Sequence, residues 1–295
     1  MLPGVHLLPP PSSPPLTPLQ RADAWAARHW WGPRLVPLLV WLLFLMLIRI
    51  TGQWSPMGLP LIYGAQVLAT ALLLLRWRRL LPEVTAHFHW LALPAAAVVF
   101  TAWLGLGWLC RGTWSESWQA ASSGGPMPLT AGTPLAQLLA DHRSLGWLTL
   151  GVRLLGMTLV VPCIEEVFFR SAIPRAIPSW RALGRRTLQM LADWPMIGPR
   201  ASRMLQTPTW SPPPAARPWP WSWAGTITST MLFMLNHQRV DWAAAAVAGL
   251  LWCALAAWAN RGPAPKGLGP VIWSHALVNA GLWAWCVARG DLAFL

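Results

Sequence analysis

The sequence predicts an all-α, polytopic membrane protein, with about seven transmembrane helices around a polar intramembrane cavity. Hydrophobic residues make up 55% of the 295 residues and charged residues 11%, whereas soluble domains contain roughly 25% charged residues. The chain also has 24 tryptophans, a residue that favours the membrane interface. The net charge of +13 comes from basic residues that alternate with apolar runs. This alternation indicates membrane topology and argues against nucleic acid as a partner.

The N-terminal residues 1–33 predict a flexible, Pro-rich tail ahead of a membrane helical domain, residues 34–295. Seven prolines up to position 18 exclude a helical signal peptide. The Trp- and Arg-containing part of the tail, Ala22–Trp31, is expected to lie at the membrane interface. The first three spans are then expected at Arg34–Ile48, Leu59–Leu75 and Trp90–Cys110.

The middle of the chain contains two long polar segments on either side of a fourth span. Arg111–Arg143 has a centre rich in Gly, Ser and Pro, which predicts an exposed loop. The fourth span, Ser144–Ile164, leads into an insertion, residues 175–220. Within the insertion, Ser179–Trp194 has the pattern of a basic, interfacial amphipathic helix, and the remainder is Pro-rich and irregular. The last three spans are expected at Trp221–His237, Trp242–Asn260 and Gly267–Ala288.

The distribution of Lys and Arg predicts how the protein is oriented. Fifteen of the 22 lie in the tail, the insertion and two further loops of one side, and five lie in the alternate loops. Because cytoplasmic loops carry the excess of basic residues, we expect a cytoplasmic N-terminus in a membrane such as the bacterial inner membrane. The C-terminal end of the fourth span then lies toward the cytoplasm.

A pair of glutamates, Glu165 and Glu166, stands at that end of the fourth span, in a chain with nine acidic residues. Ionisable groups in membrane-type sequence are costly, and their default interpretation is functional. On a helix Glu166 and Arg170 are four residues apart and can pair, whereas Glu165 points about 100° away from Glu166. The alternative is a helix end at which both glutamates reach headgroups or water.

Three more polar side chains stand out in the later spans. His237 closes the fifth span, and His275 and Asn279 are four residues apart on one face of the seventh. A single histidine is more often structural than catalytic, but polar side chains in lipid turn inward and meet. A carboxylate in an apolar site suits a general base, and a histidine with an asparagine can supply N–H donors to an oxyanion. This set of groups is typical of amide hydrolysis.

The order of these motifs resembles one known family. The chain contains no GxSxG serine motif, no nucleophilic-cysteine context and no HExxH zinc motif. It does contain Glu165-Glu166-x-x-x-Arg170, then Phe233-x-x-x-His237, then His275-x-x-x-Asn279. This ordered set resembles the CAAX protease and bacteriocin-processing (CPBP, or Abi) family of intramembrane endopeptidases. The resemblance covers a motif-bearing core, residues 144–288.

The resemblance implies a helical bundle around a cavity that opens to the cytoplasmic side and to lipid. It implies Glu165 as the base that activates water, with His237 beside it. Glu166 and Arg170 would support the site, and a further pair, His275 with Asn279, would bind the oxyanion. The expected substrate is a peptide segment or C-terminal tail at the membrane.

A second function stays open at this point: a transporter, or an immunity scaffold that binds a peptide without cleaving it. No cofactor is expected, because the pairing of Glu166 with Arg170 favours a metal-free site. If zinc were bound, its ligands would be Glu165, His237 and His275, since carboxylate and imidazole both suit it. The expected partners are a membrane-associated peptide and the lipid bilayer, and no pattern predicts an oligomeric state.

Overall fold

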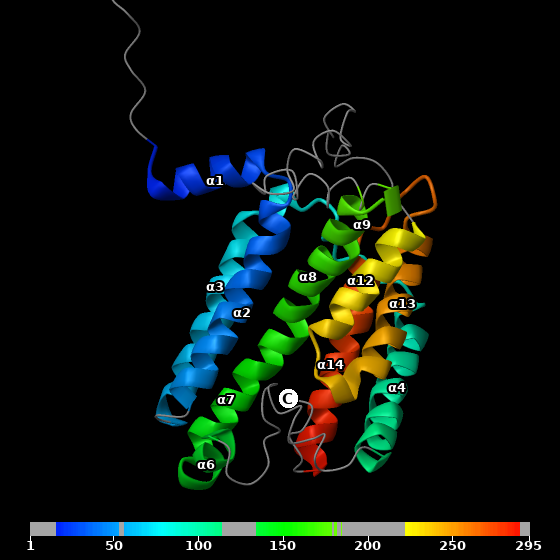
Figure 1. Cartoon of the computed structure of the whole chain (residues 1–295). Coiled ribbons are helices and arrows are strands. Elements are labelled where there is room, and N and C mark those ends of the chain that lie inside the picture. Colours follow the sequence, from blue (N-terminus) through cyan, green and yellow to red (C-terminus); the bar gives the residue numbers. More distant parts are fainter. Residues whose placement is uncertain are drawn as a thin grey trace, which may run out of the picture.

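The computed structural model describes residues 16–52, 56–113, 134–178, 180, 181, 184 and 222–289, and every regular element in these ranges is a helix (Figure 1). The prediction of an all-α chain is confirmed. The α-helices are α1 (Pro18–Arg28), α2 (Gly32–Gly52), α3 (Leu59–Arg76), α4 (Ala92–Thr113), α6 (Pro134–Asp141), α7 (Arg143–Leu155), α8 (Val161–Glu166), α9 (Ile173–Ala176), α12 (Trp223–Leu235), α13 (Trp242–Ala259) and α14 (Gly269–Arg289).

Seven apolar helical segments account for the bundle. Within the described residues, five are long and apolar enough to cross a membrane, and two are shorter. The long ones are Gly32–Ile50, Pro56–Arg76, Arg143–Ala176, Arg239–Ala259 and Gly269–Ala288, and the shorter ones are Ala92–Leu106 and Trp223–Leu235. Their order along the chain is that of the seven expected spans, so the chain is a polytopic membrane protein.

From residue 16 on, the N-terminal segment is largely helical, and residues 1–15 of the expected flexible tail lie outside the described residues. Helix α1 begins with a capping box, in which Thr17 and Gln20 bond reciprocally through side chain and backbone. It lies across the end of α2 and α3 rather than along them (Figure 1). The Asp23 carboxylate of α1 pairs with Arg76 at the end of α3, with an O–N distance of 2.7 Å. An ion pair therefore ties the expected interfacial segment to the bundle.

Part of the expected exposed loop Arg111–Arg143 is a helix with one buried face, so the expectation of a loop is wrong for residues 134–141. Leu135 and Leu138 of α6 are almost fully buried against α3 and α7. Two apolar residues three positions apart share one face of a helix and can bury together. The Gly/Ser/Pro-rich centre of this segment lies outside the described residues, as do most of Ser179–Trp194 and the Pro-rich part of the insertion.

The fourth span is longer than expected and contains two irregular stretches. The helix runs from Arg143 to Ala176, past the expected end at Ile164. It contains two π-helical segments, η3 (Gly156–Val160) and η4 (Val167–Ala172). A proline lies just after each of them, Pro162 and Pro174. The π-helical segments keep the helix continuous through both prolines and carry the glutamate pair between them.

Helix α12 is too short to cross a bilayer. Its 13 residues span about 20 Å, whereas the hydrocarbon core is roughly 30 Å thick. Figure 1 shows α12 ending part way along α14 and α4, and a short connection, η5 (Arg239–Asp241), turns into α13. Irregular backbone at membrane depth is tolerated where protein surrounds it. The end of α12 therefore lies inside the bundle, beside the fourth span.

Helix α13 packs tightly against α12 because it is rich in small residues. Ala244, Ala245, Ala248 and Ala256 are buried in the largest apolar cluster, together with Trp252. A Cβ on Gly249 would lie 2.7 Å from a side-chain carbon of Thr230. Small residues allow the backbones of membrane helices to approach closely, and this approach brings the end of α12 next to the fourth span and α14.

Candidate active site

Glu166 and Arg170 form an ion pair in the interior of the bundle. Glu166 Oε2 lies 3.1 Å from Arg170 Nε, and both side chains are fully buried. The guanidinium carbon lies 4.4 Å from the ring centre of Phe233 and 5.3 Å from that of Trp252, within the range of cation–π attraction. Among the described residues the guanidinium nitrogens have no partner in hydrogen-bond geometry. The pair is therefore an electrostatic contact enclosed by aromatic rings.

His275 of α14 joins the two glutamates. Its Nδ1 lies 2.7 Å from Glu166 Oε1, and its Nε2 lies 3.8 Å from Glu165 Oε2. Because an ionised carboxylate can only accept a hydrogen bond, Nδ1–H is the donor toward Glu166. The ring stacks on Trp252 at a centroid distance of 4.3 Å. Two carboxylates, one imidazole and one guanidinium thus form a single buried cluster.

Asn236 is a residue of this cluster that the sequence interpretation missed. Its side-chain amide Nδ2 donates to Glu165 Oε1 over 3.2 Å. Asn236 caps the C-terminus of α12, so the early end of that helix aims the amide at Glu165. The signal in the sequence was a polar side chain next to His237 at the end of an apolar span.

His237 lies next to Asn236, and its position is set by its own helix. Nδ1 lies 2.8 Å from the Phe233 carbonyl oxygen, which can only accept, so Nδ1 carries the proton and Nε2 is the nitrogen that remains for other contacts. The ring packs against Phe233 and Trp103, with centroid distances of 4.5 and 5.3 Å. The Phe233 carbonyl of α12 therefore holds this imidazole in one tautomer.

Asn279 binds backbone in the first π-helical segment. Its Nδ2 donates to the Met157 carbonyl over 2.8 Å. In η3 the Val161 N–H bonds to Gly156 five residues back, and the next residue, Pro162, has no N–H. The Met157 carbonyl is left without its usual intrahelical donor, and Asn279 supplies one. An amide has two N–H groups, so this contact leaves the second available.

Ser229 of α12 does the same for the second π-helical segment. In η4 the Ile173 N–H bonds to Phe168, and Pro174 has no N–H to give to the Phe169 carbonyl. The Ser229 hydroxyl donates to that carbonyl. The two proline-containing breaks in the fourth span are thus each held by a side chain from another helix. These bonds fix the helix on both sides of the glutamate pair.

Arg153, which the sequence leaves without an identified partner, lies on the same helix but outside the cluster. Its guanidinium donates to the Tyr63 hydroxyl of α3, and its carbon lies 4.8 Å from the centre of the Tyr63 ring. The contact packs α7 against α3. Arg153 therefore has a structural partner of its own.

The structure brings four of the six predicted site residues, Glu165, Glu166, Arg170 and His275, into direct contact. The side-chain hydrogen bonds of His237 and Asn279 go to the backbone carbonyls of Phe233 and Met157 instead. Among the described residues, no group of three or more His, Cys, Asp and Glu side chains is arranged to hold a metal ion.

A mostly apolar cavity of about 260 Å³ lies against the same helix, beginning at Phe168, one turn beyond Glu165. It is formed between the connection that precedes α2 and the C-terminal part of the fourth span. Its lining residues are Trp30, Trp31, Leu35, Phe168, Ala172, Ile173 and Ala176.

The segment that contains this cluster matches a known protein family. Residues 147–281 match the family described as type II CAAX prenyl endopeptidase, Rce1-like. Comparison with curated proteins and with solved structures gave no match. The matched segment contains the cluster and both π-helical segments, and it excludes α1 to α6. The match supports membership of the CAAX protease family for residues 147–281.

Proposed function

We propose that the protein hydrolyses a peptide bond in a membrane-associated peptide or C-terminal tail, with Glu165 as the base that activates water. The observation that carries this proposal is the buried chain of contacts Glu165–His275–Glu166–Arg170, which joins two helices. Ionisable residues that meet inside a membrane bundle mark functional sites. The CAAX-type endopeptidase family supports the same reaction.

The charges of the cluster suit the formation of an oxyanion. With both glutamates ionised and His275 protonated, the two negative charges balance those of His275 and Arg170. When Glu165 takes a proton from water, the four groups together carry one positive charge. A tetrahedral intermediate carries one negative charge on its oxygen, and N–H donors placed at such a charge are a large catalytic term. We propose that His275 Nε2–H and the second side-chain N–H of Asn279 donate hydrogen bonds to this oxyanion.

The spacing of the groups accommodates a single water. Glu165 Oε2 and His275 Nε2 are 3.8 Å apart, so one water can lie at about 2.8 Å from each. In the proposed reaction the water oxygen bonds to the scissile carbonyl carbon, and Glu165 accepts its proton. The carbon–nitrogen bond then breaks, and Glu165 returns the proton to the leaving amine. His237, which directly follows Asn236, helps to orient the water through Nε2.

The proposed substrate is a peptide with an apolar end that stays in the membrane. The matched family is named for cleaving prenylated CAAX tails, and we propose a tail of this kind for this protein. The apolar cavity one turn from Glu165 supports an apolar group in the substrate. A prenylated peptide that ends in a CAAX sequence is therefore the probe we select.

We propose a site that works without a metal. Glu166, an otherwise suitable ligand, is paired with Arg170 at 3.1 Å and with His275 at 2.7 Å. A cation bound there would face the positive charge of the guanidinium. The test is to add a chelator to the purified enzyme and then zinc. Loss of cleavage with the chelator and recovery with zinc would contradict a metal-free reaction.

We also propose that the end of the bundle that holds α1 and α9 faces the cytoplasm, in a bacterial inner membrane. The excess of basic residues supports this orientation. We expect a reporter fused after Arg79 to be active as a cytoplasmic reporter, and one fused after Asp141 to be active on the outside. The reverse pattern would move the site toward the other face and change the pool of substrates.

Glu165→Gln is the experiment that tests the proposed function. The amide keeps the size and hydrogen bonding of the carboxylate but cannot accept the proton. Loss of a general base costs on the order of 10²–10⁴-fold in rate, and we expect binding of the prenylated peptide to survive. Cleavage is measured by mass spectrometry with protein in detergent, and binding is measured separately.

Cys163→Ala is the matched control, since Cys163 lies two residues away on the same helix and is not assigned to the site. We expect it to cleave at the wild-type rate. A peptide-binding scaffold or a transporter would behave differently. Binding without any cleaved product from wild-type protein, or full cleavage by Glu165→Gln, would contradict the mechanism.

A further inference from the structure

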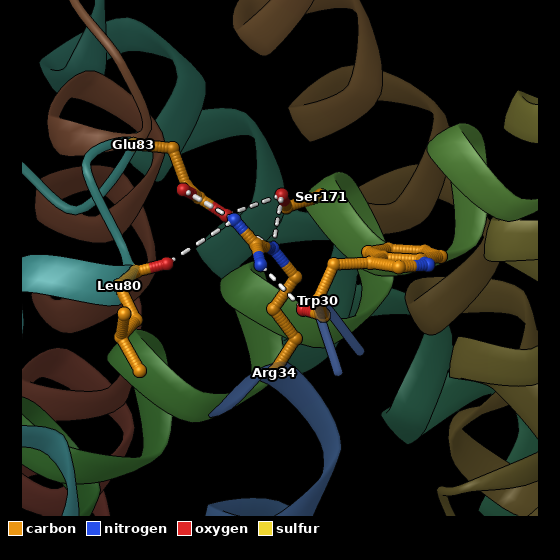
Figure 2. A network of polar contacts seen from close by, with 5 residues as sticks. All are labelled: Trp30, Arg34, Leu80, Glu83 and Ser171. Carbon is orange, nitrogen blue, oxygen red and sulfur yellow. Dashed lines mark hydrogen bonds and ion pairs between the residues drawn. The ribbon is translucent and has the colours of Figure 1, made fainter. Parts of the chain in front are cut away.

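A second buried ion pair, between Arg34 and Glu83, lies outside the family-matched segment. The Arg34 guanidinium of α2 donates two hydrogen bonds to the Glu83 carboxylate, from Nε to Oε1 at 2.7 Å and from Nη2 to Oε2 at 2.9 Å. The two side chains are 3% and 4% exposed. Arg34 also donates to the backbone carbonyls of Trp30 and Leu80 (Figure 2).

The Glu83 side chain reaches the helix that carries the glutamate pair. The hydroxyl of Ser171, in η4, donates to Glu83 Oε1 over 2.6 Å (Figure 2). Ser171 is fully buried and directly follows Arg170. The residue on the other side of Arg170, Phe169, is held through its carbonyl by Ser229. Arg170 is therefore bracketed by two bonds to other parts of the protein.

The Glu83 backbone reaches the helix that carries His275. Its carbonyl oxygen accepts from the Leu268 N–H over 2.7 Å, immediately before α14 begins. Gly267 adopts a φ of +66°, and a Cβ there would lie 2.5 Å from the same oxygen. Only glycine adopts this conformation routinely, and it allows the close approach. One residue is thus bonded to both helices whose side chains meet in the cluster.

The position of the Arg170 guanidinium depends strongly on where η4 places the backbone of this residue. Among the described residues, its guanidinium nitrogens have no hydrogen-bond partner. The ion pair and the aromatic rings attract the charge without imposing the directional geometry of hydrogen bonds. The place of the guanidinium, and through it that of Glu166, is therefore set by where η4 holds the Cα atom.

We propose that Glu83 is a positioning residue of the proteolytic site, which holds η4 through Ser171 and the start of α14 through its carbonyl. This inference rests on the proposed function. It gives the N-terminal helices, which lie outside the matched segment, a part in the reaction. Arg34 holds the carboxylate of Glu83 in place, and Ser171 transmits its position to Arg170.

Ser171→Ala tests the link, because it removes one hydroxyl and leaves the Arg34–Glu83 pair intact. A displacement of about 1 Å at a reacting group costs up to 10²-fold. We expect kcat for the prenylated CAAX peptide to fall about ten- to a hundred-fold, with KM within about twofold of wild type. Thr101→Ala, which removes an exposed hydroxyl on α4, is the matched control and is expected to retain the wild-type kcat.

A second variant removes both partners of the Arg34–Glu83 pair together. In Arg34→Met with Glu83→Leu both partners become apolar, a change that is often neutral for stability. We expect this variant to lose kcat as Ser171→Ala does. Adding Ser171→Ala to it is expected to cause no further loss, because both changes break the same contact. Additive losses would contradict a path through the Ser171–Glu83 bond.

A measurement without turnover completes the test. We expect the backbone amides of residues 167–172 to exchange hydrogen faster in Ser171→Ala than in wild type, with the melting temperature unchanged within a few degrees. Unchanged exchange together with wild-type kcat would overturn the inference. If Glu165→Gln is inactive while Ser171→Ala is fully active, the positioning role fails and the proposed function stands. If Glu165→Gln is fully active, the proposed function itself fails.

Discussion

Arg170→Met removes the guanidinium that pairs with Glu166. We expect this substitution to destabilise the protein strongly. Arg170 and Glu166 are both fully buried, 3.1 Å apart. Removal of one partner of a buried pair costs about 3–5 kcal/mol, since the other charge is left uncompensated. The loss of contact with the Phe233 ring, 4.4 Å from the guanidinium carbon, adds about 1–2 kcal/mol. Because His275 also faces Glu166, we expect a total near the lower end of the combined range of about 4–7 kcal/mol, about 4–5 kcal/mol.

The assay measures stability and activity separately. Folded protein in detergent is followed by tryptophan fluorescence on heating, and its abundance in membranes is measured in parallel. The matched variant is Arg170→Met combined with Glu166→Gln, which removes both charges. We expect the double variant to recover most of the stability and none of the cleavage. A stability of Arg170→Met within about 1 kcal/mol of wild type, close to an exposed pair, would refute the assigned burial and pairing.

Two further predictions concern the supports of the site. Asn279→Ala leaves the Met157 carbonyl unpaired in the interior, and we expect a loss of about 1–3 kcal/mol in the free energy of unfolding, measured by the same heating assay, as well as slower cleavage. Burial raises the pKa of Glu83, but the charge and hydrogen bonds of Arg34 and the bond from Ser171 outweigh this and hold the pKa below its ordinary 4.5. The pair therefore adds stability above pH 4.5 that is lost as the pH falls through the lower, folded-state pKa. We expect the wild-type melting temperature to fall more steeply with acidification below pH 4.5 than that of Glu83→Gln, and equal slopes would contradict this.

The contacts of Asn236 and Asn279 show how far a pattern of residues can locate a site. The four-residue spacing of His275 and Asn279 places both on one face of a helix whatever its surroundings, and the structure has them there on α14. Which groups they meet depends on other helices. Asn279 binds the Met157 carbonyl because Pro162 deprives that carbonyl of a donor. Asn236 meets Glu165 because α12 ends early.

The contacts among Arg34, Glu83 and Ser171 could not be predicted from the sequence, for a related reason. Arg34 begins the first expected span, and Glu83, 49 positions later, falls between the second and third expected spans. No local pattern indicates that two such residues pair, since their contact is made only when α2 and the loop after α3 reach the same end of the bundle. Ser171, a small polar residue after Arg170, gave equally little signal. Its role follows from the carboxylate that it contacts.

The sequence by itself determined the class of this protein, the order of its apolar helices and four of the residues that meet in the buried cluster. These follow from properties that each segment has alone: hydrophobicity over a bilayer's thickness, basic residues between spans and the four-residue repeat of a helix face. The tertiary structure decided that His275 bridges the two glutamates, that α12 stops inside the bundle and that Glu83 bonds both to η4 and to the start of α14. These depend on contacts between residues far apart in the chain, which exist only once burial and backbone hydrogen bonding have placed the helices against one another.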